Sequence, residues 1–266
     1  MLKVASVTAA RNEEEYLPHM IRSLQNQTLR PDPIVIVNDG STDDTGKIAR
    51  EYGCTVIDLP YHEESYARKP EIASVHNAGL NLLKNIGDLD YVLKIDADTV
   101  LPPNYLEEII TKMSKNPKLV IASGIIENEP FDETAPRGSG RVYEYKFWDD
   151  INGLVYPVTW GWESWILFKA MSLGYEIRCF SEITSKVLRS TNFSEAGSWG
   201  KGMYALGYDW RYVLLRSIRI SFKTPKGGLL MLWNWLDHAD VNKLDVADWV
   251  NKRQKALFWK QLFNGI

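Results

Sequence analysis

The chain has 266 residues, of which 45% are hydrophobic and 24% are charged, and its formal net charge at pH 7 is −3. This length suffices for one large domain or two small ones, and the composition excludes a disordered chain, a collagen-like repeat and a coiled coil. No segment approaches the roughly 20 apolar residues of a membrane-spanning helix, and we predict no signal peptide. The two cysteines lack CxxC spacing, which excludes a disulfide framework and a cysteine zinc site and fits a reducing cytosol.

The net charge hides an asymmetry between the two ends of the chain. Residues 199–266 carry eleven Lys or Arg against five Asp and no Glu, a charge of +6, whereas the remainder carries −9. All ten tryptophans lie between Trp148 and Trp259. The first half is therefore poor in tryptophan, and the second half is rich in aromatic residues and finally basic.

The first 125 residues alternate short apolar runs with amphipathic segments. Strands are predicted at 2–8, 34–38, 55–59, 91–95 and 119–123, and helices at 13–26, 45–52, 72–85 and 103–114. Such alternation predicts an α/β protein with a doubly wound, mostly parallel sheet. Ligands bind such sheets outside the carboxyl ends of the strands, at the point where the strand order reverses.

Polar loops follow three of these strands, at Thr8–Glu13, Asn38–Ser41 and Asp96–Asp98. We therefore expect them to meet at one edge of the sheet. The first strand is followed by neither GxGxxG nor GxxxxGK[ST], which argues against a hydride-transferring dinucleotide enzyme and a P-loop NTPase. The motifs HExxH and GxSxG are also absent from the sequence.

Asp96 and Asp98 are two residues apart at the end of an apolar strand. In an extended backbone both carboxylates point to the same face, and their mutual repulsion is relieved by a cation. Mg²⁺ or Mn²⁺ sites combine one or two carboxylates with substrate phosphates. The alternative is a pair of solvated acids in a turn that caps the next helix.

Three segments, SVTAARNEEEYL, IVIVNDGSTDDT and YVLKIDADTVLPPNYLE, follow one another in order. Together they resemble the opening of an inverting family 2 glycosyltransferase with the GT-A fold. The resemblance covers residues 3–125 and, more loosely, 157–220. It implies a Rossmann-like GT-A sheet with a helical C-terminal extension. It also implies a donor-binding domain at 1–125, an acceptor-binding and catalytic region at 126–200, and a basic, aromatic helical tail at 201–266.

The resemblance implies a site for a nucleotide-diphosphate sugar at the three loops. Asp39 would accept an N–H from the edge of uracil or guanine, although an Asx turn before a helix is the alternative. Where the family often has Arg before Asn77, this chain has His76, so Arg68 or Lys69 are alternative sources of positive charge. The metal ligands implied are Asp96 and Asp98. The donor-binding residues implied are Thr8, Ala10, Arg11, Glu13, Asp39, Gly40, Asn77, Asp96, Ala97, Asp98 and Arg189.

The second half is expected to carry the general base. The family has a Glu-Asp pair about eleven residues before a Gly-Tyr, and counting back from Gly174 gives Glu163 in place of the Asp and Trp162 in place of the Glu. The resemblance implies that Glu163 removes the proton of the acceptor hydroxyl during an inverting displacement through an oxocarbenium-like transition state. The alternative is a surface glutamate at a helix start.

Two further groups of residues have alternative interpretations. Trp160, Trp162 and Trp165 either stack on the acceptor sugar or fill a core wall. The basic, aromatic segments within 211–263 suit a helix lying in a membrane interface, or an amphipathic tail packed on the catalytic domain. The negative charge of the remainder opposes binding to nucleic acid.

The sequence thus predicts an enzyme, a glycosyltransferase that uses Mg²⁺ or Mn²⁺ and inverts configuration. It would transfer one sugar from a UDP- or GDP-linked donor to a hydroxyl acceptor, a glycolipid or a polysaccharide. The expected location is the cytoplasm, with peripheral contact on the inner face of the membrane if the acceptor is lipid-linked. One alternative is a catalytically inactive nucleotide-sugar-binding protein. The other, a sugar nucleotidyltransferase, is opposed by the absence of glycine from TAARNEEE.

Overall fold

The structure, a computed structural model, describes residues 2–189 and 199–263. It consists of two compact units that interleave along the sequence. Unit 1 comprises residues 1–65, 72–156 and 174–190, and unit 2 comprises 66–71, 157–173 and 191–266. Residues 190–198, which follow the predicted donor-binding residue Arg189, lie outside the described residues.

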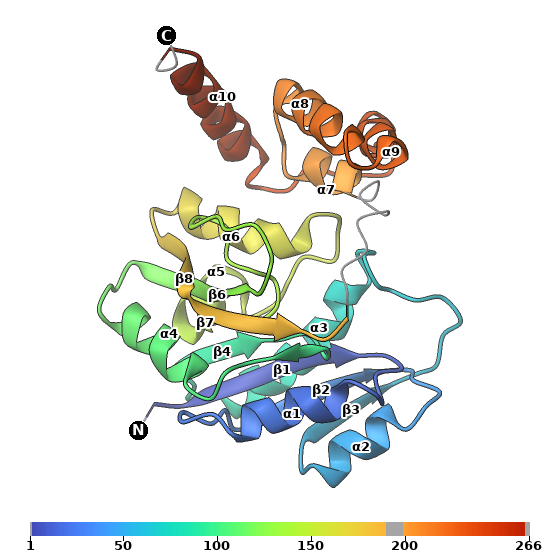
Figure 1. The fold of residues 1–266 in the computed structure, drawn as a ribbon, viewed down its shortest axis with the longest axis vertical. Helices are drawn as coiled ribbons and strands as arrows, with labels where there is room; N and C mark the ends of the chain where they lie inside the picture. The colour runs from blue at the N-terminus through green and yellow to red at the C-terminus, as the bar shows by residue number, and fades with distance from the viewer. Residues whose placement is uncertain (1, 190–198, 264–266) are drawn as a thin grey trace. The chain divides into compact units, whose positions relative to one another are not determined.

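Unit 1 is built on a sheet of eight strands in the described part of the chain, in the order β3-β2-β1-β4-β7-β6-β8-β5 (Figure 1). Their bounds are β1 Val4–Ala10, β2 Ile34–Asp39, β3 Thr55–Leu59, β4 Tyr91–Lys94, β5 Thr99–Val100, β6 Leu119–Ile126, β7 Arg141–Glu144 and β8 Glu176–Val187. The β1 strand pairs in parallel with both β2 and β4, and β2 pairs in parallel with β3. The predicted doubly wound, mostly parallel arrangement is confirmed.

The sequence did not predict β5 and β8, nor β7, which runs antiparallel between β4 and β6. The β8 strand pairs in parallel with β6, and the two-residue β5 pairs antiparallel with the far end of β8. Because β5 directly follows Asp98, this pairing brings the end of β8 beside the Asp96–Asp98 loop. The backbone N–H of Leu188 donates to the Asp98 carbonyl over 2.8 Å.

Helices cover both faces of this sheet (Figure 1). One core cluster joins α1, α2 and α4 to alternate strand residues such as Val4, Ile36 and Leu93. On the opposite face, Gly79 of α3 sits so close to β1 that a Cβ there would lie 2.5 Å from Val7 Cγ2. The helices of unit 1 are α1 Leu17–Gln25, α2 Thr45–Glu51, α3 Ile72–Ile86, α4 Tyr105–Ser114 and α5 Tyr145–Asn152.

The described part of unit 2 is helical, which confirms the predicted helical C-terminal region. Its helices are α6 Trp162–Ser172, α7 Trp199–Ala205, α8 Trp210–Ser221, α9 Pro225–Leu236 and α10 Ala247–Phe263. No described helix combines the length and the apolar character needed to cross a membrane. The prediction of membrane contact also included aromatic side chains after residue 256 in α10, and the structure does not describe those side chains.

Candidate functional site

Asp39 ends β2 at the carboxyl edge of the sheet, and its side chain is almost fully buried. Gly40 follows in the left-handed region, with φ 61°. A Cβ at this position would lie 2.7 Å from the carbonyl oxygen of Pro60. Glycine is therefore needed for both the turn and the close approach of the loop after β3, and this approach brings that loop against Asp39.

His62, in the loop after β3, contacts the carboxylate of Asp39. Its Nε2 lies 3.0 Å from Asp39 Oδ1, and its Nδ1 lies 2.9 Å from a guanidinium nitrogen of Arg11. The same guanidinium nitrogen donates to the Asp39 carbonyl over 3.0 Å. His62 Nδ1 also lies against the carbonyl oxygen of Glu64, so the ring is held between two acceptors, Asp39 and Glu64, and beside the Arg11 guanidinium. Three polar side chains from three strand ends therefore meet at one point.

The Asp96–Asp98 loop leaves β4 two strands away from β2, on the other side of β1. Lys94, the last residue of β4, is buried, and its ammonium lies 2.7 Å from Asp96 Oδ1. The Asp96 backbone N–H donates to the Ser139 hydroxyl over 2.9 Å. One of the two predicted metal-binding carboxylates thus already carries a buried positive partner.

Asp98 belongs to a second polar cluster, formed with Glu13 and Arg189. The Arg189 guanidinium donates to the Glu13 carboxylate, and its Nε lies 4.0 Å from Asp98 Oδ2. It also stacks over the ring of Tyr16, with its central carbon 4.9 Å from the ring centroid. Glu13 and Arg189 are 176 residues apart in sequence. Their contact therefore places the segment that follows β8 against the loop that follows β1.

Burial raises the pKa of Asp98, and the charge of Asp96 raises it further, whereas Arg189 lowers it. Burial also raises the pKa of Glu13; Arg189 lowers it and the Asp98 charge raises it. The net effect of these influences is to raise the pKa of both Asp98 and Glu13 above its ordinary value. Two carboxylates that are costly to ionise at one sheet edge mark a place where an added positive charge is favourable.

The donor set fits a divalent cation that is shared with a ligand, but not one held by protein alone. Among the described residues, no group of three or more His, Cys, Asp or Glu side chains is placed to hold a metal ion. Asp98 and Asp96 supply carboxylate oxygens, which Mg²⁺ and Mn²⁺ prefer, and such sites are completed by substrate phosphates and water. Lys94 contacts one oxygen of Asp96, and the Arg189 guanidinium lies 4.0 Å from one oxygen of Asp98.

The other predicted donor-binding residues of unit 1 lie within the fold. Thr8, Ala10 and Ala97 are buried. Asn77 of α3 clamps the backbone of Tyr156: its Nδ2 donates to the Tyr156 carbonyl over 2.8 Å and its Oδ1 accepts the Tyr156 N–H over 2.7 Å. A donor-binding role for Asn77 stays a prediction, since both polar atoms have structural partners.

The predicted base and the three tryptophans lie in unit 2. Glu163 is in the first turn of α6, where a negative charge is favourable beside the helix N-terminus. Trp165 is buried, and its indole N–H donates to Asp245 Oδ1 over 2.7 Å, which favours the core-wall interpretation for this residue. Trp160 and Trp162 are half-buried, and the Lys201 ammonium lies 5.8 Å from the centroid of the Trp160 ring.

Sequence reasoning missed two residues of the unit 1 edge, His62 and Lys94. His62 comes three residues after the end of β3, so the rule applied to the other strand ends would have found it. Lys94 reads as an interruption of an apolar strand. A buried lysine needs a partner, and the acids two and four residues later were the available signal.

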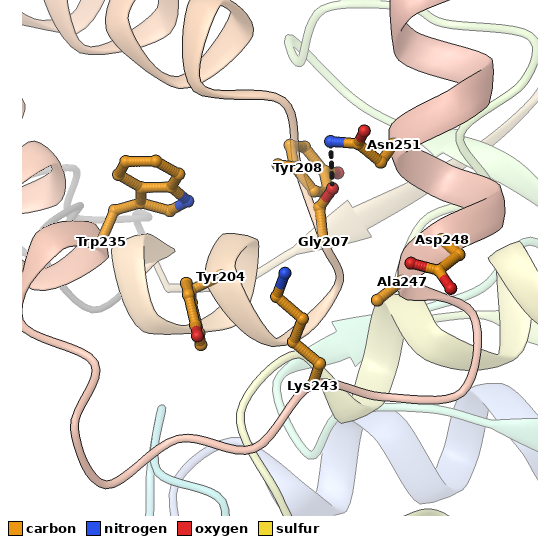
Figure 2. Close-up of a pocket in the computed structure, with 8 residues that line it drawn as sticks. All are labelled: Tyr204, Gly207, Tyr208, Trp235, Lys243, Ala247, Asp248 and Asn251. Carbon is orange, nitrogen blue, oxygen red and sulfur yellow. Dashed lines mark hydrogen bonds between the residues drawn. The ribbon is translucent and has the colours of Figure 1, made fainter.

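Unit 2 also contains a pocket of about 160 Å³. Aromatic and polar side chains surround it, and the dashed line in Figure 2 is the 3.2 Å bond from Asn251 Nδ2 to the Gly207 carbonyl. The Tyr204 ring stacks on the His238 ring, with centroids 3.6 Å apart, and the Lys243 ammonium lies 5.5 Å from the centroid of the Tyr204 ring. No predicted site residue lines this pocket, which is formed by Tyr204, Gly207, Tyr208, Trp235, Lys243, Ala247, Asp248 and Asn251.

Comparison with known sequences finds one matching family and relatives that are named glycosyltransferases. Residues 6–173 match the profile of the family described as Glycosyl transferase family 2. The Streptococcus pneumoniae protein named glycosyltransferase GlyA is 25% identical over 247 residues, which are 91% of this chain and 34% of that protein. The Bacillus subtilis protein EpsH is 28% identical over 144 residues, 53% of this chain and 39% of that protein. The chain spans between a third and two fifths of the length of these relatives.

Solved structures share the fold. The mannosyltransferase PcManGT from Pyrobaculum calidifontis, determined with GDP-Man and Mn²⁺, superposes with a TM-score of 0.60 at 13% identity, over 96% of this chain and 80% of that one. TarS residues 1–349 from S. aureus, determined with UDP, superposes with a TM-score of 0.56 at 16% identity, over 88% of this chain and 71% of that one. The predicted GT-A fold is confirmed.

Proposed function

The chain belongs to glycosyl transferase family 2, and on that premise we propose that it transfers one sugar from a nucleotide-diphosphate donor to a hydroxyl group of an acceptor. One observation carries the proposal. The carboxyl ends of β1, β2, β3 and β4 bring Asp39, with Arg11 and His62 against it, to the same sheet edge as the acidic cluster of Glu13, Asp96 and Asp98, which Lys94 and Arg189 contact. Such an edge matches the two ends of a nucleotide diphosphate, a base and a doubly charged phosphate chain.

The base would bind at the Asp39 end. A carboxylate accepts the N–H of a uracil or guanine edge, and Arg11 supplies donors for the ring carbonyl. Both bases satisfy this description, and the structurally similar proteins were solved with UDP or GDP-Man. We therefore include UDP- and GDP-linked sugars among the candidate donors.

The diphosphate would bind at the Asp98 end, where Arg189 offers a guanidinium beside Glu13. Asp98 and Asp96 would hold Mg²⁺ or Mn²⁺ together with the phosphate oxygens. When bound, the cation neutralises the negative charge that gathers on the departing diphosphate. Arg189 would orient the phosphate chain by donating hydrogen bonds to it.

Glu163 is proposed as the general base. Its carboxylate takes the proton of the acceptor hydroxyl while the hydroxyl oxygen forms a bond to C1 of the sugar. The bond from C1 to the diphosphate oxygen breaks on the opposite face, and the nucleoside diphosphate leaves with the electron pair. Configuration at C1 is therefore inverted.

The first experiment tests donor use. Release of nucleoside diphosphate is measured from a panel of UDP- and GDP-linked sugars, with Mn²⁺ or with chelator. We expect Asp98→Asn to reduce release by several orders of magnitude and to abolish the Mn²⁺-dependent part of donor binding. Asp88→Asn, the same change at the exposed amino end of β4, should leave both unchanged. Donor binding without release by the wild type would show an inactive nucleotide-sugar-binding protein, and full activity of Asp98→Asn would refute the metal site.

The second experiment tests the base. Glu163→Gln should bind donor as the wild type does and lose about 10²–10⁴-fold in turnover, the usual contribution of general base catalysis. Glu51→Gln, an exposed change at the end of α2, is the matched control. Wild-type turnover in Glu163→Gln would move the search to the acids Asp149, Asp150 and Glu182.

A further inference from the structure

Helices α8 and α9 of unit 2 form a closely packed hairpin. Gly228 of α9 lies against α8 where a Cβ would clash with the Ser217 carbonyl, and Gly200 of α7 lies against the Met231 carbonyl of α9 in the same way. Met203, Val213 and Met231 form the small core between these helices. The inner faces of both helices are therefore occupied by their neighbours, and this fixes which faces point outward.

The outward faces of the hairpin carry apolar rows. Leu215, Ile218 and Phe222 have the spacing i, i+3, i+7 along α8 and the residue after it, and Leu229, Trp233 and Leu236 have the spacing i, i+4, i+7 along α9. Each set therefore lies on one side of its helix. All six are exposed, with Phe222 at 86%, Leu229 at 69% and Trp233 at 63%. Exposed apolar rows of this kind mark an interaction site.

A basic row lies beside the apolar row of α8. Arg216, Arg219 and Lys223 repeat the spacing i, i+3, i+7 one residue further along. No Asp or Glu occurs between Asp209 and Asp237. Arg219 and Lys223 are exposed and have no acidic partner within the described ranges. Their charges are therefore available to an external anion.

We propose that the outer faces of the α8–α9 hairpin bind the interface of a membrane that contains anionic lipids. Apolar side chains on stretches too short to span enter the boundary between headgroups and acyl chains, and adjacent Lys and Arg bind the negative headgroups. This inference does not depend on the proposed chemistry of unit 1.

Two other occupants fit the charges less well. A symmetric dimer through this face would apply the same patch twice and would leave the basic rows of both copies without an anionic partner. A nucleic acid would satisfy the basic row through its phosphates but would leave the apolar rows of α8 and α9 in water. An anionic bilayer offers acyl chains to the apolar rows and negative headgroups to the basic row.

The test is co-sedimentation of the full chain with vesicles of phosphatidylcholine, alone or with 30% phosphatidylglycerol (about a third anionic lipid), at low and high salt. The first variant, Phe222→Ser with Trp233→Ser, changes only exposed side chains, and Phe131→Ser, an exposed residue of unit 1, controls for loss of apolar surface. The second variant is Arg219→Glu with Lys223→Glu. Its control is Lys115→Glu with Lys118→Glu, which makes the same charge change at exposed residues of unit 1.

We expect the wild type to bind the anionic vesicles at low salt and to dissociate as salt screens the charges. Each basic residue contributes about fivefold to binding an anionic surface, so Arg219→Glu with Lys223→Glu should weaken binding by on the order of 25-fold or more. Phe222→Ser with Trp233→Ser should weaken binding at every salt concentration. Both control variants should match the wild type, and circular dichroism spectra should be the same for all five proteins.

Absence of wild-type binding to anionic vesicles at low salt would overturn the proposal. Binding that the hairpin variants retain would also overturn it, because another surface would then be responsible. A concentration-dependent dimer in light scattering that Phe222→Ser with Trp233→Ser dissolves, without vesicle binding by the wild type, would assign the face to a second copy instead.

Discussion

Asn77 offers a direct test of whether a predicted donor-binding residue is a structural one. Its side-chain amide makes two hydrogen bonds to the backbone of Tyr156, at 2.8 Å and 2.7 Å. Tyr156 is buried, its hydroxyl lies 2.7 Å from that of Tyr143, and its ring lies 4.8 Å from that of Trp148. Asn77→Ala removes both bonds and leaves a backbone N–H and a carbonyl without partners.

The expected loss follows from the number of groups left unsatisfied. A buried polar group without a partner costs about 1–3 kcal/mol, so two partly buried groups predict a loss of about 2–4 kcal/mol. For a chain of this size, each kcal/mol lowers the melting temperature by roughly 2–4 °C, so we expect a decrease of roughly 5–15 °C. Asn81→Ala changes an exposed residue one turn further along α3 and makes the same gain in helix propensity.

The assay is thermal unfolding of both variants with and without UDP or GDP. The structural role predicts that Asn77→Ala melts well below Asn81→Ala without nucleotide, and that nucleotide raises the melting temperature of both by the same amount. The reasoning is refuted if the two variants melt within about 1 °C of each other, a difference far below the expected shift. A nucleotide effect that disappears only in Asn77→Ala would restore the donor-binding role.

Two further predictions concern side chains outside the proposed chemistry. His62→Ala should bind UDP or GDP about fivefold more tightly in titration calorimetry, because the imidazole bond to Asp39 no longer has to be exchanged for a bond to the base; weaker binding would show that the ring itself contacts the nucleotide. Burial raises the pKa of Asp245, but hydrogen bonds from Lys169 and Trp165 outweigh burial and hold it below the usual range. A lowered pKa stabilises the folded state above the unfolded pKa, near 4, and this stability is lost as the pH falls through the folded value. At pH 7 the free energy of unfolding from urea titrations should therefore be about 0.5–1 kcal/mol higher for the wild type than for Asp245→Asn. This difference should shrink as the pH falls below the unfolded pKa, near 4. A difference that stays constant as the pH is lowered below about 4 would contradict the ion pair.

The central strands were predictable because burial on both faces leaves its mark on the sequence. IVIVN in β2 has no polar interruption before its end, which is typical of a parallel strand covered by helices on both sides. The β7 strand and β5 were missed for the opposite reason. RVYE and the two residues of β5 are too short to show a period, and their strand identity depends on partners that lie far away in sequence.

The site was predictable where it follows from strand ends and not where it depends on distant pairing. Asp39, Asp96 and Asp98 lie where the rule of carboxyl ends places ligands. The contact of Arg189 with Glu13 joins residues 176 positions apart, and no local spacing encodes it. The resemblance to the family named Arg189 as a candidate, and the fold supplied its partner.

The position of β6 has a consequence for folding during synthesis. Both of its neighbours in the sheet, β7 and β8, come later in the chain. A nascent chain that ends near residue 125 therefore exposes two unpaired edges on β6 and one on β4, each with free backbone N–H and carbonyl groups. Until residue 187 has left the ribosome, the first half of the protein has no complete sheet, and we expect it to be a substrate for chaperones that shield exposed strands.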